Sequence, residues 1–255
     1  MKYIKTYEQN NSFNFLEIVK EGNLDVVKKL LKRPDIDVNI QDYYGNTALH
    51  LASNNKRLNI VKELLKHPKI DINIKNNKGE TTLILATHNN DLSIVKELLK
   101  HSEIDVNIQD IFKGTALYIA AFDNKLDILK ELLKKSDIDV NIKHNFDDTA
   151  LIRAVIKNHL DIVKELLKNP NIDVNVRNDG GRTALIQAVN NSRRFDNFIE
   201  IVVELLNYDK TDWNIMDNFG KDFIDYLGND LFIKYQYPEQ YQKYLIRKKA
   251  SIYNI

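Results

Sequence analysis

The sequence contains no cysteine. Disulfide bonds, thiolate metal sites and a thiol nucleophile are therefore excluded. It also lacks an excess of charge of either sign, with 37 Lys and Arg residues against 36 Asp and Glu residues. Proteins that bind nucleic acid or membrane surfaces through their overall charge normally carry a basic excess. The balance therefore argues against both kinds of partner.

Long apolar runs are missing as well. No run approaches the roughly 18 apolar residues of a membrane-spanning helix, and residues 1–8 hold no apolar core of a secretory signal. We expect an intracellular, cytoplasmic protein. The strings GxxxxGK[ST], GxGxxG, HExxH, GxSxG and CxxC, which mark common nucleotide, metal and catalytic sites, are absent. We therefore predict no enzymatic activity, no cofactor, no metal and no small-molecule substrate.

What the chain does contain is a repeat of 34 residues. Thr47 and the pair Leu64-Leu65 both return at this step. A fixed period in this range indicates a stack of small units, none of which can bury its apolar face alone. Such stacks usually bind partners. The string Asp37-Val38-Asn39 has copies that begin at Asp71, Asp105, Asp139, Asp173 and, after 39 residues, Asp212.

Residues 42–75 show how one unit is expected to fold. Residues 42–46 carry a turn signal with a central glycine, and Thr47 stands where the N-cap of a short first helix belongs. Apolar residues at helical spacing predict a second helix over about residues 58–66. We expect residues 71–74 to be extended and to lead into the next turn.

This unit resembles the ankyrin repeat. The family's Gly-x-Thr-Pro-Leu-His-x-Ala string appears as Gly45-Asn46-Thr47-Ala48-Leu49-His50-Leu51-Ala52, and its Val-x-x-Leu-Leu string as Val61-Lys62-Glu63-Leu64-Leu65. The resemblance covers roughly residues 13–227. It implies an all-α repeat solenoid, an ankyrin-like stack of helix-loop-helix units with turn or hairpin tips. About seven units are expected, including degenerate caps.

We predict a single ankyrin repeat domain over residues 1–255. The tetratricopeptide stack also has a period of 34, but prolines followed by an Asp-x-Asn string fit its longer helices badly. Five extra residues fall within 190–197, because the Asp-x-Asn step there is 39 rather than 34. The predicted units are 9–41 as N-terminal cap, 42–75, 76–109, 110–143, 144–177, 178–216 with the insertion, and 217–255 as C-terminal cap and tail.

The departures from the family pattern concern glycine. The tip glycine is replaced by Asp147 in the fifth unit, and Gly114 sits one residue late in the fourth, so we expect these two tips to be distorted. The glycine that follows the first helix is kept only as Gly22. Its other copies are mostly asparagine, the next best residue for a left-handed turn: Lys56, Asn90, Asn124 and Asn158.

The resemblance also implies how such a stack is used. Partners of ankyrin-like stacks contact the tips and the exposed side of the first helix, which together form a concave groove. We predict a non-catalytic protein-protein interaction module, present as a monomeric stack. The alternative is a structural or inhibitory subunit, or an adaptor that masks or recruits another protein through its Tyr-rich C-terminal segment. The predicted partner-binding residues are Tyr43, Tyr44, Asn54, His88, Ile111, Phe112, Phe122, Asp123, Phe146, Ile156, Lys157 and Arg182.

Overall fold

The computed structural model describes residues 11–192, 198–227, 238–239 and 242. Within these residues all regular elements are helices, and they form six pairs, with α14 beginning a seventh unit. The predicted all-helical stack of paired helices is therefore confirmed. None of the helices in this part of the chain is both long and apolar enough to cross a membrane.

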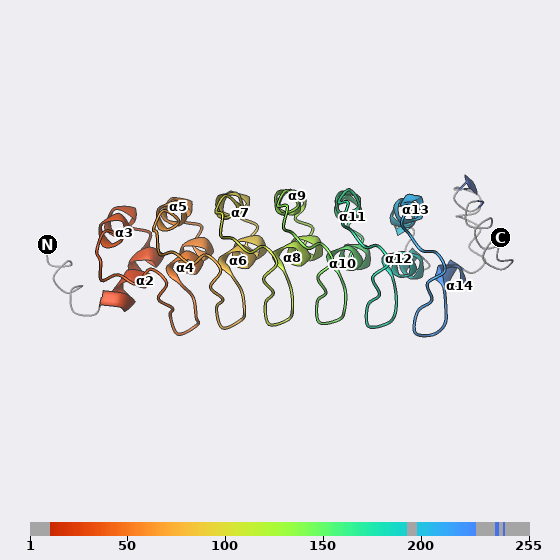
Figure 1. Ribbon diagram of the computed structural model, residues 1–255, viewed down its shortest axis with the longest axis horizontal. Helices are drawn as coiled ribbons and strands as arrows, with labels where there is room; N and C mark the ends of the chain where they lie inside the picture. The colour runs from red at the N-terminus through yellow and green to blue at the C-terminus, as the bar shows by residue number, and fades with distance from the viewer. Residues whose placement is uncertain (1–10, 193–197, 228–237, 240–241, 243–255) are drawn as a thin grey trace. The chain divides into compact units, whose positions relative to one another are not determined.

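The chain divides into two compact units, and each is described by itself. Unit 1 comprises residues 1–120 and 127–138. From α2 to α7, its first helices pack on one another, as do its second helices, and each first helix also packs on its own second helix. Figure 1 shows the loops of this unit extending past the first helices, away from the second helices. Unit 1 holds α2 (Asn11–Glu21), α3 (Leu24–Leu30), α4 (Ala48–Asn54), α5 (Leu58–Leu64), α6 (Thr82–His88), α7 (Leu92–Leu99) and most of α8 (Ala116–Phe122) and α9 (Leu126–Leu132).

Unit 2 comprises residues 121–126 and 139–255. Its helices pack in the same pattern, with α12 in contact with α10, α13 and α14. The α12 to α13 connection includes residues 193–197, so most of the predicted insertion lies outside the described residues. The Tyr-rich C-terminal segment beyond residue 227 lies almost wholly outside them too. The helices of unit 2 are α10 (Ala150–Ile156), α11 (Leu160–Leu167), α12 (Ala184–Ser192), α13 (Ile199–Asn207) and α14 (Phe223–Leu227).

The first helices begin where the repeated threonine predicts. Thr81 Oγ1 accepts a hydrogen bond of 3.4 Å from the Ile84 N–H, and Thr149 Oγ1 accepts one of 3.3 Å from the Ile152 N–H. An N-cap side chain of this kind satisfies one of the amides that a helix start leaves without an intrahelical partner. The helices are only seven residues long, so packing rather than intrinsic propensity stabilises them.

In the five helix pairs from α4 to α13, each first helix has a completely buried alanine at the same position of the repeat. Each second helix of these pairs has a completely buried leucine at an equivalent position. Burying a leucine side chain stabilises a fold by about 2 kcal/mol, so the repeated strings mark the core. These residues are Ala52, Ala86, Ala120, Ala154 and Ala188, with Leu64, Leu98, Leu132, Leu166 and Leu205.

The Asp-x-Asn string forms a turn, so the prediction of an extended return over residues 71–74 is wrong. The Asp71 carboxylate accepts a hydrogen bond of 2.9 Å from the Asn73 N–H and closes the chain locally. Asp and Asn side chains commonly compete with extended structure in this way. The Asn73 side chain then bridges to the next repeat. Its Nδ2 donates to the Glu103 carbonyl at 2.7 Å, and its Oδ1 accepts from the Asp105 N–H at 2.9 Å.

The two tips that lack a glycine at the expected place are not distorted, which corrects our second expectation. Lys113 and Asp147 take the left-handed conformation themselves, with φ of 62° and 54°. The Lys113 N–H donates to the Asp110 carbonyl at 3.0 Å, matching the 2.9 Å bond between Gly45 and Asp42. The prediction for the turn after the first helix is confirmed, since Lys56, Asn90, Asn124 and Asn158 all have positive φ.

Replacing Asn73 by alanine is expected to lower the free energy of unfolding by about 1–2 kcal/mol, because both bonds to the next repeat are lost. The measurement is urea unfolding followed by circular dichroism. Asn59→Ala is the matched control, since Asn59 lies exposed on α5 and surface changes usually stay within about 0.5 kcal/mol. Equal midpoints for the two variants would contradict the role given to Asn73.

Replacing Lys113 by glycine is expected to raise the free energy of unfolding by about 0.5–1 kcal/mol. A left-handed L-residue costs roughly 1–2 kcal/mol, and the greater freedom of glycine in the unfolded chain offsets about half of that. Thermal unfolding checks this. The reverse change, Gly79→Ala, should be destabilising, because a Cβ there would lie 2.8 Å from the Ile111 backbone nitrogen. A Lys113→Gly protein less stable than the wild type would show that the lysine side chain compensates its backbone strain.

Candidate functional site

The tip turns hold two neighbouring side chains away from the helices. In the second repeat Asp42 Oδ1 accepts from the Tyr44 N–H at 2.9 Å and from the Asn46 N–H at 2.8 Å. This leaves Tyr43 86% exposed and Tyr44 68% exposed, with their rings edge to face at 5.4 Å. Asp110 forms the same bonds to Phe112 and Gly114. The predicted tip residues of unit 1 are thus presented by a turn that does not depend on them.

Backbone hydrogen bonds link consecutive tips in each unit. In unit 1 the Asn77 N–H donates to the Tyr44 carbonyl at 3.0 Å, and the Ile111 N–H donates to the Lys78 carbonyl at 3.1 Å. In unit 2 the Asp179 N–H donates to the Phe146 carbonyl at 3.2 Å. The Asn77 side chain adds a second link, since its Nδ2 donates to the Tyr43 carbonyl at 3.0 Å. The side chains of Tyr44, Ile111 and Phe146 take no part in the backbone bonds, so their chemistry can vary without breaking them.

A hollow of about 380 Å³ lies between the tips and the first helices of the second and third repeats in unit 1. Tyr44 and Asn54, two of the predicted partner-binding residues, belong to its lining. Glu80 and Leu85 line it from the third repeat. His88 is exposed close by, with Nε2 4.0 Å from a carboxylate oxygen of Glu80. The structure thus brings three of the sequence-predicted residues to one place.

His50 also lines this hollow and is only 1% exposed. Its Nδ1 accepts from the Thr47 N–H at 3.2 Å and lies 2.8 Å from Thr47 Oγ1. The remaining ring proton then sits on Nε2, which lies 3.0 Å from the Glu80 carbonyl and donates to it. Burial lowers the pKa of His50 below 6.5, against the opposing influence of Glu80 and Asp42. The imidazole is therefore a neutral bridge between two repeats.

In unit 2 the aromatic ring of Phe122 lies under two cations. Lys157 Nζ is 4.5 Å from the ring centroid, and the Arg153 guanidinium carbon is 5.7 Å from it. Such cation-π contacts are worth about 0.5–1 kcal/mol at exposed sites. Phe122 is accordingly less exposed than the tip residues, at 38%. Ile156, on the same helix as Arg153, is half-buried.

Asp148 fixes the position of Arg153. Its Oδ2 accepts a hydrogen bond of 2.6 Å from Arg153 Nη2, and its Oδ1 accepts one of 3.1 Å from Asn178 Nδ2. Burial raises the pKa of this carboxyl, although the Asn178 bond and the arginine charge oppose that shift.

The predicted residue Asp123 is exposed and forms an ion pair of 2.7 Å with Lys125.

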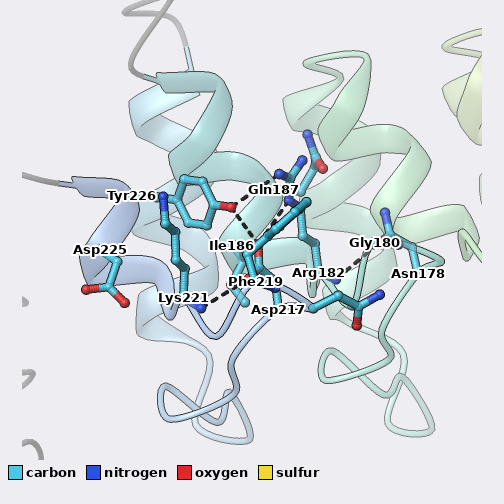
Figure 2. A network of polar contacts seen from close by, with 12 residues as sticks. Asn178, Gly180, Arg182, Ile186, Gln187, Asp217, Phe219, Lys221, Asp225 and Tyr226 are labelled. Atoms are coloured by element: carbon cyan, nitrogen blue, oxygen red, sulfur yellow. Dashed lines mark hydrogen bonds and ion pairs between the residues drawn. The ribbon is translucent and has the colours of Figure 1, made fainter.

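Arg182, predicted to contact a partner, is part of an internal network (Figure 2). Its Nη2 donates to the Tyr226 hydroxyl at 3.2 Å, and its Nε lies 3.5 Å from Asp217 Oδ2. The Tyr226 hydroxyl donates to the same carboxylate oxygen at 2.5 Å. Burial alone would raise the pKa of Asp217, but the bonds from Tyr226 and from the backbone N–H groups of Lys221 and Phe219 lower it. The network ties α14 to the tip before it.

Sequence reasoning missed two exposed apolar residues of unit 2. Phe219 is 74% exposed and Met216 is 54% exposed. The signal was present, since Phe219 occupies the same tip position as Tyr44, Phe112 and Phe146 once the five extra residues are counted. Phe146 is 60% exposed, and its ring lies 5.7 Å from that of His144.

Comparisons with known proteins agree with this architecture. The family model described as "Ankyrin repeats (3 copies)" matches residues 15–110 and 117–217. The chain belongs to the ankyrin repeat family. Ankyrin repeat domains are generally protein-protein interaction modules and are typically non-catalytic. The resemblance to the ankyrin repeat and the fold predicted from the sequence are both confirmed.

Two solved ankyrin repeat structures illustrate the similarity. EF0377, an ankyrin repeat protein, is 32% identical with a TM-score of 0.66, over 75% of this chain and 91% of that chain. The ankyrin repeat domain of Bcl-3, a member of the IkappaB protein family, is 21% identical with a TM-score of 0.74, over 83% of this chain and 92% of that chain. The second likeness shows the fold alone. A search of the curated proteins found no match.

His50 should make the stability of this ankyrin repeat protein depend on pH. Because its folded-state pKa lies below the unfolded value of about 6.5, the unfolded chain binds the proton first. The free energy of unfolding should therefore fall as the pH drops below about 6.5. His50→Ile installs the residue found at Ile84, Ile152 and Ile186. The free energy of unfolding of the wild type minus that of the variant, measured by urea unfolding from pH 7.5 to 5.5, should decrease as the pH falls. A constant difference would contradict this.

Proposed function

We propose that this chain binds a partner protein through the groove formed by its tips and first helices. What supports the proposal most is the exposure of large apolar tip residues that packing among the described residues does not require. Tyr43, Tyr44, Ile111, Phe112, Phe146 and Phe219 are each more than half exposed. Exposed aromatic anchors of this kind are the usual hot spots of protein interfaces.

The framework supports the same proposal. Threonine caps, buried alanines and Asp-x-Asn turns recur in the repeats from α4 to α13, and none of these residues is a tip residue. A rigid surface loses little conformational entropy on binding, so most of the contact energy remains available as affinity. Polar groups beside the anchors, such as Asn54, His88, Asp123 and Lys157, would then select among partners. Arg182 would contribute only the donors that Tyr226 and Asp217 leave available.

The proposal is tested by a quantitative pull-down from native lysate. The first variant carries Tyr43→Ser, Tyr44→Ser, Ile111→Ser and Phe112→Ser, all in unit 1. The second carries Phe122→Ser, Phe146→Ser, Ile156→Ser and Phe219→Ser, all in unit 2. Removing hot-spot residues should weaken partner binding by about 2 kcal/mol or more, roughly 30-fold. At least one of the two variants should therefore lose the partner.

The matched control changes the opposite side of the repeats. Lys62→Ser, Lys66→Ser and Lys100→Ser remove three exposed lysines that lie in or directly after the second helices α5 and α7, and this protein should bind like the wild type. Circular dichroism establishes that every variant keeps its helices. If both tip variants retain the same proteins as the wild type while the lysine variant loses them, the binding face lies on the second helices and the proposal is wrong.

A further inference from the structure

Two equivalent carboxylates of this chain meet different surroundings. Glu80 and Asp148 both stand one residue before the threonine N-cap, two periods of 34 apart. In unit 2, Asp148 is 3% exposed and forms its 2.6 Å bond with Arg153, which stands five residues further along the chain. In unit 1, the residue five positions after Glu80 is Leu85. The chain thus supplies an arginine to one carboxylate and a leucine to the other.

Glu80 is held in place by amide groups rather than by an arginine or a lysine. Its Oε2 accepts a hydrogen bond of 3.0 Å from Asn76 Nδ2, and Asn76 Nδ2 also lies 3.2 Å from Asn46 Oδ1. Its Oε1 is 4.0 Å from Nε2 of His88. The Glu80 side chain is 14% exposed, so the carboxylate is fixed in position and still open to the hollow.

The remaining walls of the hollow suit a long cationic side chain. Leu51 and Leu85 provide apolar surface, and the exposed ring of Tyr44 stands at the tip side. Burial lowers the pKa of His50 overall, and the charges of Glu80 and Asp42 oppose that shift, as expected of two carboxylates near this hollow. Lys78 is the lysine of the lining, and it is exposed.

We propose that this hollow receives an arginine side chain of the partner protein, with the guanidinium paired to Glu80 and stacked on Tyr44. The inference rests on the proposed function and names the chemistry that this part of the groove selects. The partner's arginine would take the role that Arg153 plays in unit 2, where the guanidinium meets a carboxylate and an aromatic ring at once. Arginine is favoured over lysine because its planar fork pairs with carboxylates in two-point contacts and stacks on aromatic faces.

The probe is Nα-acetyl-arginine methylamide, titrated into the full-length ¹⁵N-labelled chain while amide signals are followed by NMR. We expect saturable shifts at Tyr44, Asn54 and Glu80 with a dissociation constant in the millimolar range. The matched citrulline compound has nearly the same shape and no charge, and it should bind at least 10-fold more weakly. Equal shifts with both compounds, or none with arginine, would overturn the inference.

Two variants test the site from the protein side. Glu80→Gln keeps the size of the side chain and removes its charge, so it should weaken arginine binding at least 10-fold. Leu85→Arg rebuilds within unit 1 the pair seen between Arg153 and Asp148, and its internal guanidinium should block the probe. Glu97→Gln is the control, because Glu97 lies on a second helix and pairs with Lys100 at 2.8 Å. Binding that survives in both Glu80→Gln and Leu85→Arg would overturn the inference.

The same variants separate this inference from the proposed function. Each is compared with the tip variants in binding the partner isolated by the pull-down. Loss of the partner in the tip variants, with full binding by Glu80→Gln and Leu85→Arg, would overturn the arginine site and leave the groove function standing. Retention of the partner by all of these variants would overturn both. Loss in the tip variants together with a 10-fold or greater loss in Glu80→Gln and Leu85→Arg, but not in Glu97→Gln, would support both.

Discussion

The stack depends on the hydrogen bonds that the asparagine of the Asp-x-Asn strings makes to the next repeat. In unit 1 the Asn73 side chain reaches the next repeat, at Glu103 and Asp105, with both of its polar atoms. In unit 2 Asn141 reaches Asn171 and Asp173 in the same way. The preceding aspartate closes the turn that aims the amide. Repeats of this size contact only their neighbours. These bonds, with the buried alanines and leucines, therefore set the spacing between consecutive repeats and so the spacing of the tips.

Fixed and variable positions are separated along every repeat. Caps, core residues and turn-closing aspartates repeat with the period, whereas tip residues and the exposed side of the first helix change from one repeat to the next. The position just before the N-cap stands between the two groups. It carries Glu80 in unit 1 and Asp148 and Arg182 in unit 2, and the side chain of each has different partners. Specificity can therefore be varied there without changing the core.

Much of this could be read from the sequence, because repetition multiplies a weak local signal. Thr81 and Thr149 cap helices as predicted, and Asn90 adopts the left-handed turn expected of it. The errors came from local competition. Asp71 closes a turn where an extended return was expected, and Lys113 absorbs a left-handed conformation where a distorted tip was expected. The repeat pattern alone does not decide either outcome, because each depends on which local hydrogen bonds the backbone forms.

The candidate site was less predictable than the fold. Exposure of Tyr43, Tyr44 and Phe112 followed from their tip positions, but the contacts of Arg182 with Tyr226 and Asp217 join residues 35 or more positions apart. No period links these three, because the step changes to 39 in this part of the chain. The hollow beside Glu80 depends on Leu85 standing where another repeat has an arginine, and only the three-dimensional register makes that difference meaningful.

The backbone ladder that joins the tips has a consequence for how such a surface can change over generations. The carbonyl of Tyr44 and the amide of Asn77 are backbone groups, so their bond remains possible with any residue other than proline at position 77. A single-nucleotide change in a tip codon can therefore alter the chemistry of the surface while the folding of the stack stays nearly constant. Lineages carrying this scaffold could move from one partner to another through a series of folded intermediates, each one substitution apart.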